Sequence, residues 1–586
     1  MRRTVSILRF VLSLLVFTVC SLGAAFAQTP PNICDLIDQL GIPKQLNAHA
    51  YEILVACGRV PPPPPASSSS AVSFSNPTNL GGVDQDVVLG GEGTYPHVTQ
   101  SETQIWTEGT TSVVAYNDSR TAGSCYAGAS YSTDRGATWT DMNSRPFCSG
   151  DGTNYGDPVV VYDKKHTRWL AGFLATGCGG QGIGIWSSVD GINWSAGSCA
   201  HTGSSDDRQS GWVDNTPTSP FYGRVYLTWN DFALGQFIFV TFSDDGGVTW
   251  SGALQVESNA AFIRNVQVTT GPNGTVFVAG MDEGSGGLSS RLNYVFRSTN
   301  GGTSWSQIQM GSSFAAPGSS TCGYFAAMFP SYWRHMGWGD IGAGPSGVIH
   351  YAYAQHGAGT DTGDIYYTRS TDDGLTWSAA TRLNTDSGIR LQWQPALSVS
   401  PAGHVFVSWY DARNTTGNDY ERWGRLSNDN GVTWQADDVI SDASSPLPLQ
   451  PDPNVQPCYA GDYDRSFADG TAFFISWVDG RTLISGNSQQ DVFFDKVPDG
   501  PQPLTLTATG YRVKGTEFAD LSWSPTVPGG NVNIIRDSIT IATATDTGAY
   551  TDNIGAKGNN DTYVYQVCRV ETGECSNLAT VKFGTK

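Results

Sequence analysis

Residues near the starts of several predicted β-strands have side chains that suit chemistry on an anionic ligand. A guanidinium binds a carboxylate through two parallel hydrogen bonds, and three arginines occupy comparable places in successive groups of strands: Arg208, Arg264 and Arg334. The phenol of Tyr463 can act as a nucleophile once a base removes its proton. The proton donor for the departing group would then be Asp157 or Asp207.

Further polar residues would complete a binding site around this set, namely His335, Asp340 and Asp462. The same residue types also form ion pairs and turn caps between strands, and that structural role is the interpretation we favour. The carboxylates of Asp462, Asp464 and Asp469 leave room for a structural calcium ion, although their spacing is not that of a known calcium loop. No Walker, Cys-x-x-Cys or His-Glu-x-x-His motif is present, so no other metal or cofactor is expected.

The strands that carry these residues alternate with a repeated stretch, which reads SDDGGVTWS at Ser243–Ser251. Asp245 can accept hydrogen bonds from the turn backbone, Gly247 permits a positive φ, and Trp250 can pack between neighbouring sheets. The third position of the successive copies is occupied by Asp134, Asp190, Asp245, Asn300, Asp372 and Asp429. A motif copied in this way cannot mark one unique site, so we interpret it as structural.

The repeats are long and each contains several short strands. Their final tryptophans are Trp139, Trp194, Trp250, Trp305, Trp377 and Trp434, at nearly equal intervals except between Trp305 and Trp377. An apolar strand ending in aromatic-x-Asp, such as Val225 to Asp231, lies upstream of most copies. Periods above about 40 residues indicate propeller blades. We therefore predict an all-β chain with a seven-bladed β-propeller, or a six-bladed one, in which a strand near Val72 to Leu80 joins the last blade.

The stretch S-x-D-x-G-x-T-W resembles the Asp-box, or BNR repeat, of sialidase-like β-propellers. For that family the resemblance implies three arginines on a substrate carboxylate, a tyrosine nucleophile assisted by a glutamate, and an aspartate acid/base. This chain departs from the family in two respects. Ser144-Arg145-Pro146 follows a box, whereas the family has Arg-Ile-Pro before the first one, and no glutamate is evident as a base for Tyr463.

Blade topology separates the boxes from the predicted ligand loops. In a four-stranded meander the box joins the third and fourth strands, so it opens on the face opposite to the second-to-third and blade-to-blade loops. Propeller ligands usually bind at the latter face. The insertion Gly311 to Trp338 lies on that face and is rich in aromatic residues, which suits either sugar stacking or a small satellite core.

Two further sets of residues have predicted structural roles. The pattern Asp-x-Arg recurs at Asp118, Asp411 and Asp479, and we expect each to form a structural ion pair. Removal of a signal peptide leaves ten cysteines, an even number that suits disulfides. The predicted pairs are Cys34 with Cys57, Cys125 with Cys148, Cys178 with Cys199, Cys322 with Cys458 and Cys568 with Cys575.

The domain boundaries follow from composition. Residues 1–27 form a cleaved signal peptide, 28–60 a small disulfide-stapled helical segment, 61–76 a Pro/Ser-rich linker and 77–499 the propeller. Residues 500–586 resemble a fibronectin type III domain, with six predicted strands and a buried Trp523. We expect a secreted protein, extracellular or periplasmic.

The formal charge of −20 argues against nucleic acid or an anionic membrane as a partner, and no apolar stretch after the signal is long enough to span a bilayer. We expect a monomer whose partner is a glycan or polysaccharide. The function we infer is a sialidase-like glycoside hydrolase acting on extracellular glycans, with acidic sugars as one substrate class. The alternatives are a non-catalytic glycan- or protein-binding propeller, and a polysaccharide lyase with His335 or Tyr463 as base beside Arg334.

Overall fold

The computed structural model describes residues 34, 37–38, 53–54, 56–59 and 80–584, with gaps at 89, 92, 95–96, 258–261, 285–289, 319–336, 417–418, 447–460, 485, 501–503, 525, 527–529, 558–560 and 571–572. The predicted signal peptide, the linker and most of the helical segment lie outside the described residues. Arg334, His335, Cys322 and Cys458 also lie outside them.

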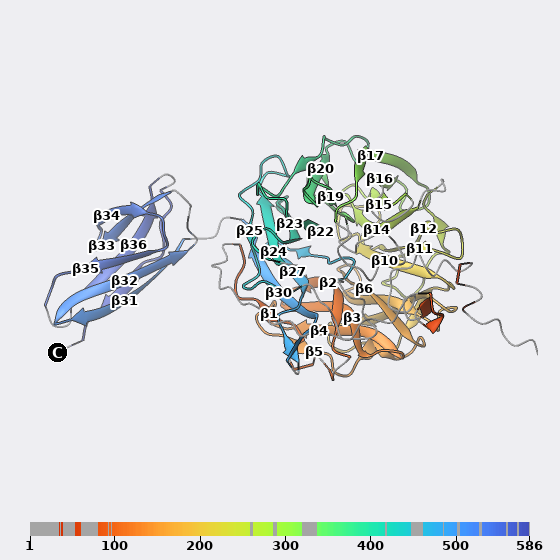
Figure 1. The fold of residues 1–586 in the computed structure, drawn as a ribbon, viewed down its shortest axis with the longest axis horizontal. Coiled ribbons are helices and arrows are strands. Elements are labelled where there is room, and N and C mark those ends of the chain that lie inside the picture. The colour runs from red at the N-terminus through yellow and green to blue at the C-terminus, as the bar shows by residue number, and fades with distance from the viewer. Residues whose placement is uncertain are drawn as a thin grey trace, which may run out of the picture.

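Residues 85–498 form antiparallel four-stranded sheets that surround a common axis, as Figure 1 shows. The first two sheets are linked by one parallel bridge between β4 and β6. They contain β2 (Gln100–Glu108), β3 (Thr111–Thr121), β4 (Cys125–Ser132) and β5 (Thr140–Asp141), then β6 (Asn154–Asp163), β7 (Arg168–Ala175), β8 (Gly182–Ser188) and β9 (Ser198–His201). A 3-10 helix, Pro146–Cys148, lies between them.

The next sheets follow the same order along the chain. They contain β10 (Asp206–Val213), β11 (Val225–Asp231), β12 (Phe237–Ser243) and β13 (Leu254–Gln255); β14 (Ile263–Thr270), β15 (Val276–Asp282), β16 (Ser290–Ser298) and β17 (Ser306–Ala315); and β18 (Asp340–Ala343), β19 (Ile349–Gln355), β20 (Asp364–Ser370) and β21 (Thr381–Arg382). After them come β22 (Gln392–Val399), β23 (Val405–Asp411), β24 (Glu421–Ser427) and β25 (Asp438–Val439).

The last sheet of the ring is built from both ends of this region. Its strands are β26 (Phe467–Ala468), β27 (Ala472–Asp479), β30 (Asp491–Pro498) and the early strand β1 (Gln85–Asp86). A small hairpin of β28 (Leu483–Ile484) and β29 (Asn487–Ser488) lies between β27 and β30. Such sheets are consistent with propeller blades, and the second strands β11, β23 and β27 are buried along their whole length because neighbouring sheets cover both faces.

The early strand that joins the last sheet is Gln85–Asp86, which pairs with Phe494 and Phe493 of β30. The strand predicted near Val72 to Leu80 lies, except for Leu80, outside the described residues. Just before Gln85–Asp86, the backbone N–H of Gly82 donates to both carboxylate oxygens of Asp495, at 3.0 and 2.8 Å. The backbone approaches Asp495 so closely that a Cβ on Gly81 would lie 1.7 Å from that carboxylate. The pair of glycines therefore sets where this strand begins.

The Asp-box turns lie at the end of each sheet opposite to the candidate site residues. At the end of β10, Val213 pairs with Val225, and Val225 pairs with Ser243, after which the box turn begins. Asp207 pairs with Asn230, at the other end of β11. The register thus separates box and candidate residues by the length of a strand, as predicted.

The hydrogen bonds within the boxes stabilise the turn that each box forms. In the copy at Ser243–Ser251, the carboxylate of Asp245 accepts bonds from Ser243 Oγ (2.8 Å), Thr249 N (2.9 Å) and Thr249 Oγ1 (2.6 Å). Burial raises the pKa of Asp245, but these bonds outweigh burial and lower it to about 2. Since that pKa is below the unfolded value, the stabilisation is present at neutral pH and is lost as the pH falls toward 2.

We predict that Asp245→Ala lowers the free energy of unfolding by about 1–2 kcal/mol, because turn donors lose their acceptor, and leaves glycan turnover or binding unchanged. Urea unfolding and the binding or activity assay measure the two effects. The natural comparison is Asp245→Asn, since the box at Asn300 already uses an amide whose Oδ1 accepts from Ser304 N at 3.0 Å. Asp245→Asn should lower the free energy of unfolding less than Asp245→Ala does. Loss of glycan turnover or binding in Asp245→Ala without a loss of stability would contradict the structural role of Asp245.

Four of the predicted disulfides are present in the described residues, and they confirm the predicted pairing. They are Cys34–Cys57, Cys125–Cys148, Cys178–Cys199 and Cys568–Cys575. The bridges from Cys125 and Cys178 each tie a second-to-third loop to the segment leading into the next sheet. They therefore brace the loops at the end of the sheets where the candidate site residues lie.

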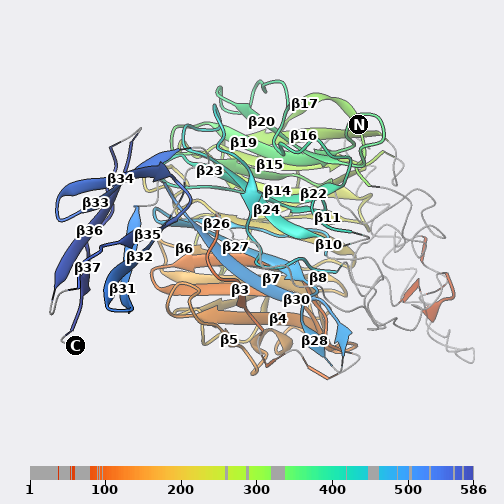
Figure 2. The same cartoon turned by 60° about the vertical axis from the view of Figure 1, so that its left-hand side comes forward.

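A second group of strands follows the ring and lies to one side of it in both views (Figures 1 and 2). One sheet contains β31 (Thr505–Val513), β32 (Thr516–Ser524) and β35 (Ala549–Asn553), and the other contains β33 (Asn531–Arg536), β34 (Ile539–Thr545), β36 (Thr562–Arg569) and β37 (Ala579–Lys582). Their buried side chains, including Trp523, form one core. The strand Ala549–Asn553 was not predicted, because its polar composition resembles a turn. Membership of the fibronectin type III family stays a prediction.

Within the described residues, no helix has the length and apolar character needed to cross a bilayer.

Candidate functional site

The innermost strands carry irregularities that turn polar side chains toward their neighbours. Five residues there that are not glycine have a left-handed backbone: Glu102 (φ 58°), Asp157 (φ 59°), Arg208 (φ 55°), Asn265 (φ 64°) and Gln394 (φ 51°). Each lies where the register of its strand shifts against the next strand. A β-bulge re-aims a side chain and increases local twist, so these strands present a cluster of polar groups at one end of the sheets.

Tyr463 lies inside this cluster. Its ring is covered by the guanidinium of Arg208, whose Cζ is 3.5 Å from the ring centroid. Only 3% of Tyr463 is exposed, and its hydroxyl has no hydrogen-bond partner among the described residues. Burial, followed by the charges of Asp157 and Glu102, raises the pKa of Tyr463 well above its usual value. The phenol is therefore neutral and would need a base to become nucleophilic.

Two carboxyl groups lie beside this tyrosine, from strands β2 and β6. The Asp157 carboxyl is hydrogen-bonded to that of Glu102, and burial, together with the charge of Asp207, raises the pKa of Asp157 to about 7. Two hydrogen-bonded carboxyls require a proton between them, so one of the pair is an acid near neutral pH. Asp157 Oδ2 also accepts from the backbone N–H of Arg208 at 3.1 Å.

A glutamate, Glu102, lies close enough to Tyr463 for its charge to raise the pKa of the phenol. Its Oε1 accepts from the backbone N–H of Asp462 at 3.0 Å, and its Oε2 accepts from Asn117 Nδ2 at 2.5 Å. These bonds hold the carboxylate next to the segment that carries Tyr463. The signal in the sequence was the polar run Gln100 to Gln104 directly before Ile105 and Trp106.

Two of the predicted arginines come together, and both are bonded to protein groups. Arg264 Nη2 donates to Asp207 Oδ2 at 2.6 Å, and both side chains are at most 1% exposed. Arg208 Nη2 donates to Asn265 Oδ1 at 2.5 Å. The ring of Trp338 lies 5.5 Å from the Cζ of Arg208 and 5.7 Å from that of Arg264.

Trp338 is held in place by a hydrogen bond of its own. Its indole N–H donates to Glu283 Oε1 at 2.5 Å, which keeps the ring facing both guanidinium groups. In the sequence, Trp338 is recognisable only as the last residue of an aromatic insertion.

The structure pairs Asp340, at the start of β18, with an arginine that was not predicted. Its carboxylate pairs with Arg465 at 3.3 Å, and Arg465 Nη1 also donates to Ser210 Oγ at 2.8 Å. Arg465 follows Tyr463 by two residues and contacts strands β10 and β18, which belong to different sheets. This arginine therefore crosses the axis of the ring.

The three carboxylates considered for calcium do not gather around one point. Asp464 accepts from Tyr410 (2.6 Å) and Gln394 (3.2 Å), whereas Asp469 pairs with Arg135 at 2.5 Å. Asp462 donates its backbone N–H to Glu102. Asp464 and Asp469 are already bonded to hydroxyl, amide and guanidinium groups, and among the described residues the three carboxylates do not form one group of metal ligands, so they do not fit a shared calcium ion.

The recurring Asp-x-Arg pattern forms ion pairs, as predicted. The distances are 2.7 Å from Asp118 to Arg120, 2.7 Å from Asp411 to Arg413 and 2.6 Å from Asp479 to Arg481.

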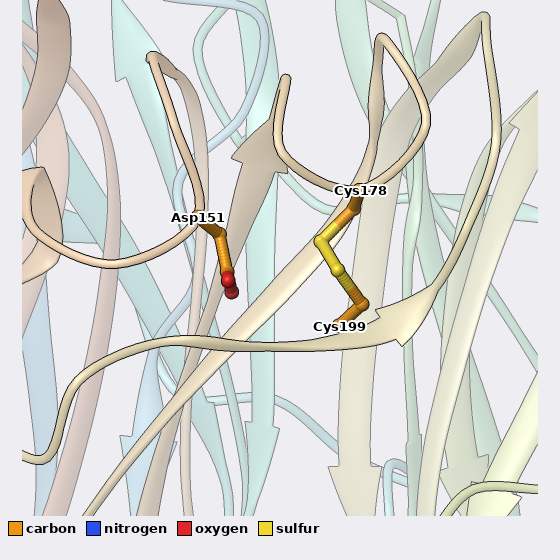
Figure 3. Close-up of side chains that lie close together, drawn as sticks. All are labelled: Asp151, Cys178 and Cys199. Atoms are coloured by element: carbon orange, nitrogen blue, oxygen red, sulfur yellow. A yellow bond between two sulfur atoms is a disulfide. The ribbon is translucent and has the colours of Figure 1, made fainter.

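One group of possible metal ligands occurs among the described residues: Asp151, Cys178 and Cys199, with ligand atoms within 4.8 Å of one another. Figure 3 shows the Asp151 carboxylate beside the bond that joins the two sulfurs. Because both sulfurs belong to the Cys178–Cys199 disulfide, neither is a thiolate that could bind a metal.

No protein-family model matches the chain, and no curated protein sequence matches it. Among solved structures, it is similar to a protein of unknown function from Dyadobacter fermentans (TM-score 0.37, 12% identity, covering 58% of this chain and 94% of the other). It is also similar to the intramolecular trans-sialidase of Ruminococcus gnavus, with a TM-score of 0.37 and 12% identity over 66% of this chain and 99% of the other. A third similar structure is the α-L-arabinanase of Penicillium chrysogenum, with a TM-score of 0.31 and 13% identity over 48% of this chain and 79% of the other. The chain is distantly similar in structure to sialidase- and arabinanase-type β-propeller glycosidases.

Proposed function

We propose that the protein is an exported glycoside hydrolase that acts on extracellular glycans containing acidic sugars. The observation that carries the proposal is the hydrogen-bonded carboxyl pair of Asp157 and Glu102 beside Tyr463 and Arg208. An acid with a pKa of about 7 can protonate a leaving group at neutral pH, and an adjacent carboxylate can take the phenol proton.

The roles follow from this arrangement. Glu102 removes the Tyr463 proton as the phenolate oxygen attacks the anomeric carbon, while Asp157 gives its proton to the departing glycosidic oxygen. Water then attacks the anomeric carbon and gives a proton to Asp157, while Glu102 returns its proton to the departing tyrosine oxygen. Arg208 and Arg264 supply positive charge for a substrate carboxylate, with Trp338 fixing their orientation.

The wider architecture belongs to the same proposal. We infer a ring of seven blades, with β1 completing the last sheet, followed by a domain of the fibronectin type III kind. The disulfides of the described residues support an oxidising, extracellular location, to which the predicted signal peptide at 1–27 would direct the chain.

A non-catalytic glycan-binding propeller is the second candidate, and the burial of the cluster favours it. Arg264 already has Asp207 as a counter-ion, and Arg208, Tyr463 and Asp157 are each at most 3% exposed. A lyase would need Arg334 beside a base, either His335 or Tyr463; Arg334 and His335 lie outside the described residues, and that alternative stays a prediction.

The test is hydrolysis of a panel of sialosides and uronic-acid polysaccharides by wild type and by Tyr463→Phe. We expect wild-type turnover on at least one substrate and a loss of about 100-fold or more in kcat for Tyr463→Phe. The matched control is Tyr226→Phe, which alters another buried tyrosine at the Asp-box end of β11 and should keep full activity. Glycan binding without turnover by the wild type would select the second candidate.

A further inference from the structure

A hollow opens around the axis at the end of the sheets opposite to Tyr463. It has a volume of about 300 Å³ and is lined by the last residues of the innermost strands and by the loops that follow them. A narrower hollow of about 80 Å³ continues from it along the axis, sharing Trp106, Trp212 and Phe467, and reaches Arg465. Arg465 thus lies between this hollow and the Tyr463 cluster.

The walls of the hollow are aromatic. Trp106 contacts Trp212 edge to face with centroids 5.5 Å apart, and it packs against Phe467 at 4.4 Å. Trp212 and Phe467 are partly exposed, so parts of their rings remain available to a ligand. Only 5% of Trp106 is exposed, and its indole N–H has no partner among the residues that the structure describes.

The rim of the hollow is rigid and carries two hydroxyl groups. Four of its residues are prolines from the loops that follow successive innermost strands: Pro217, Pro272, Pro345 and Pro401. Proline fixes φ, so these loops lose little entropy when a ligand binds. Thr216 and Ser400 add hydroxyl groups to the same rim.

The charges of the rim point to a neutral ligand. Lys164 is the cationic residue among those lining the hollow, and its ammonium group pairs with Glu108 at 3.4 Å. An acidic ligand would have to compete with that pair in a protein whose formal charge is −20. This differs from the Tyr463 cluster, where two guanidinium groups lie together.

We propose that this hollow is a second carbohydrate site, which binds one uncharged sugar residue. A pyranose ring presents apolar C–H faces that pack on indole and phenyl rings, and hydroxyls that suit the rim. A volume of about 300 Å³ is at the lower limit for small-molecule sites, which suits a single sugar better than a protein segment. The site would hold a neutral part of a glycan at the Asp-box end of the ring.

The test is saturation-transfer NMR and calorimetry with methyl glycosides of glucose, galactose, mannose and xylose as probes. Wild type should bind at least one of them, and Trp212→Ala should weaken that binding by 10-fold or more. Thr216→Trp provides a second variant, because it narrows the rim at a side chain that is only half-buried, and it should block binding while the protein stays folded.

Tyr463→Phe separates this proposal from the proposed hydrolase. It should leave the binding of neutral glycosides intact, and Thr216→Trp should leave hydrolysis of small acidic substrates intact. Binding that survives both Trp212→Ala and Thr216→Trp, or no binding of any neutral glycoside by the wild type, would overturn the proposal. Concentration-dependent dimerisation that Thr216→Trp abolishes, without glycoside binding, would instead assign the hollow to a second copy of the chain.

Discussion

Asp157→Asn is expected to lower kcat by about 100-fold or more on whichever acidic glycan the wild-type protein cleaves. The amide retains an oxygen that accepts the Arg208 backbone N–H but has no acidic proton to give to the leaving group. Thermal unfolding should show that the variant remains folded, since the substitution keeps the size of the side chain. Steady-state hydrolysis with a chromogenic leaving group measures the effect, and a good leaving group should reduce it.

The pH profile gives the same prediction a second readout. Burial and then Asp207 raise the pKa of Asp157 to about 7. The protonated form is the active acid, so wild-type activity should fall as the pH rises through about 7. In Asp157→Asn this limb of the profile should disappear.

A matched control lies on the same strand. Asp163 is also buried but at the opposite end of β6, where it accepts the backbone N–H of Lys165. Asp163→Asn should therefore leave kcat and the pH profile unchanged. If Asp157→Asn behaved like Asp163→Asn, Asp157 would not be the proton donor.

Asp207→Asn is expected to lower the free energy of unfolding by about 3–5 kcal/mol, because it removes the carboxylate charge that faces the fully buried Arg264. The pair links strands β10 and β14 of neighbouring sheets. Urea unfolding followed by tryptophan fluorescence measures the change. Replacing both partners, as in Asp207→Leu with Arg264→Met, should recover most of the stability, because no uncompensated charge is then buried.

The comparison for this pair is an exposed one of similar length. Arg224 and Asp244 lie 2.7 Å apart, but the Asp244 side chain is 60% exposed. Asp244→Asn should cost less than about 1 kcal/mol. If Asp207→Asn and Asp244→Asn lowered the free energy of unfolding equally, burial of the Asp207–Arg264 pair would contribute nothing to stability.

The double variant also bears on function. If Arg264 binds a substrate carboxylate, Asp207→Leu with Arg264→Met should be stable yet raise KM for acidic substrates by 10-fold or more. If the double variant is stable and its KM is unchanged, the role of Arg264 is only the structural ion pair that links two sheets.

Local patterns along the chain were sufficient to predict recurring strands such as Val225–Asp231, the box turns and the short-range disulfides. The box at Ser243–Ser251 is closed by bonds between residues two to four positions apart, and the Cys125–Cys148 bridge spans 23 positions. Interactions of such short range depend on spacing and residue type alone, which a sequence displays directly. The Asp-x-Arg ion pairs were predictable for the same reason.

The composition of the site depended on contacts that no local pattern contains. Glu102 meets the segment of Tyr463 across 360 positions, because closing the ring brings the first innermost strand beside the last. Trp338 reaches Arg208 and Arg264 from the segment just before β18, the first strand of another sheet. The register and the bulges of separate sheets determine which side chains converge at the axis. A shift of one residue in the register turns a side chain to the other face of its sheet. The register and bulges are therefore properties of the assembled ring.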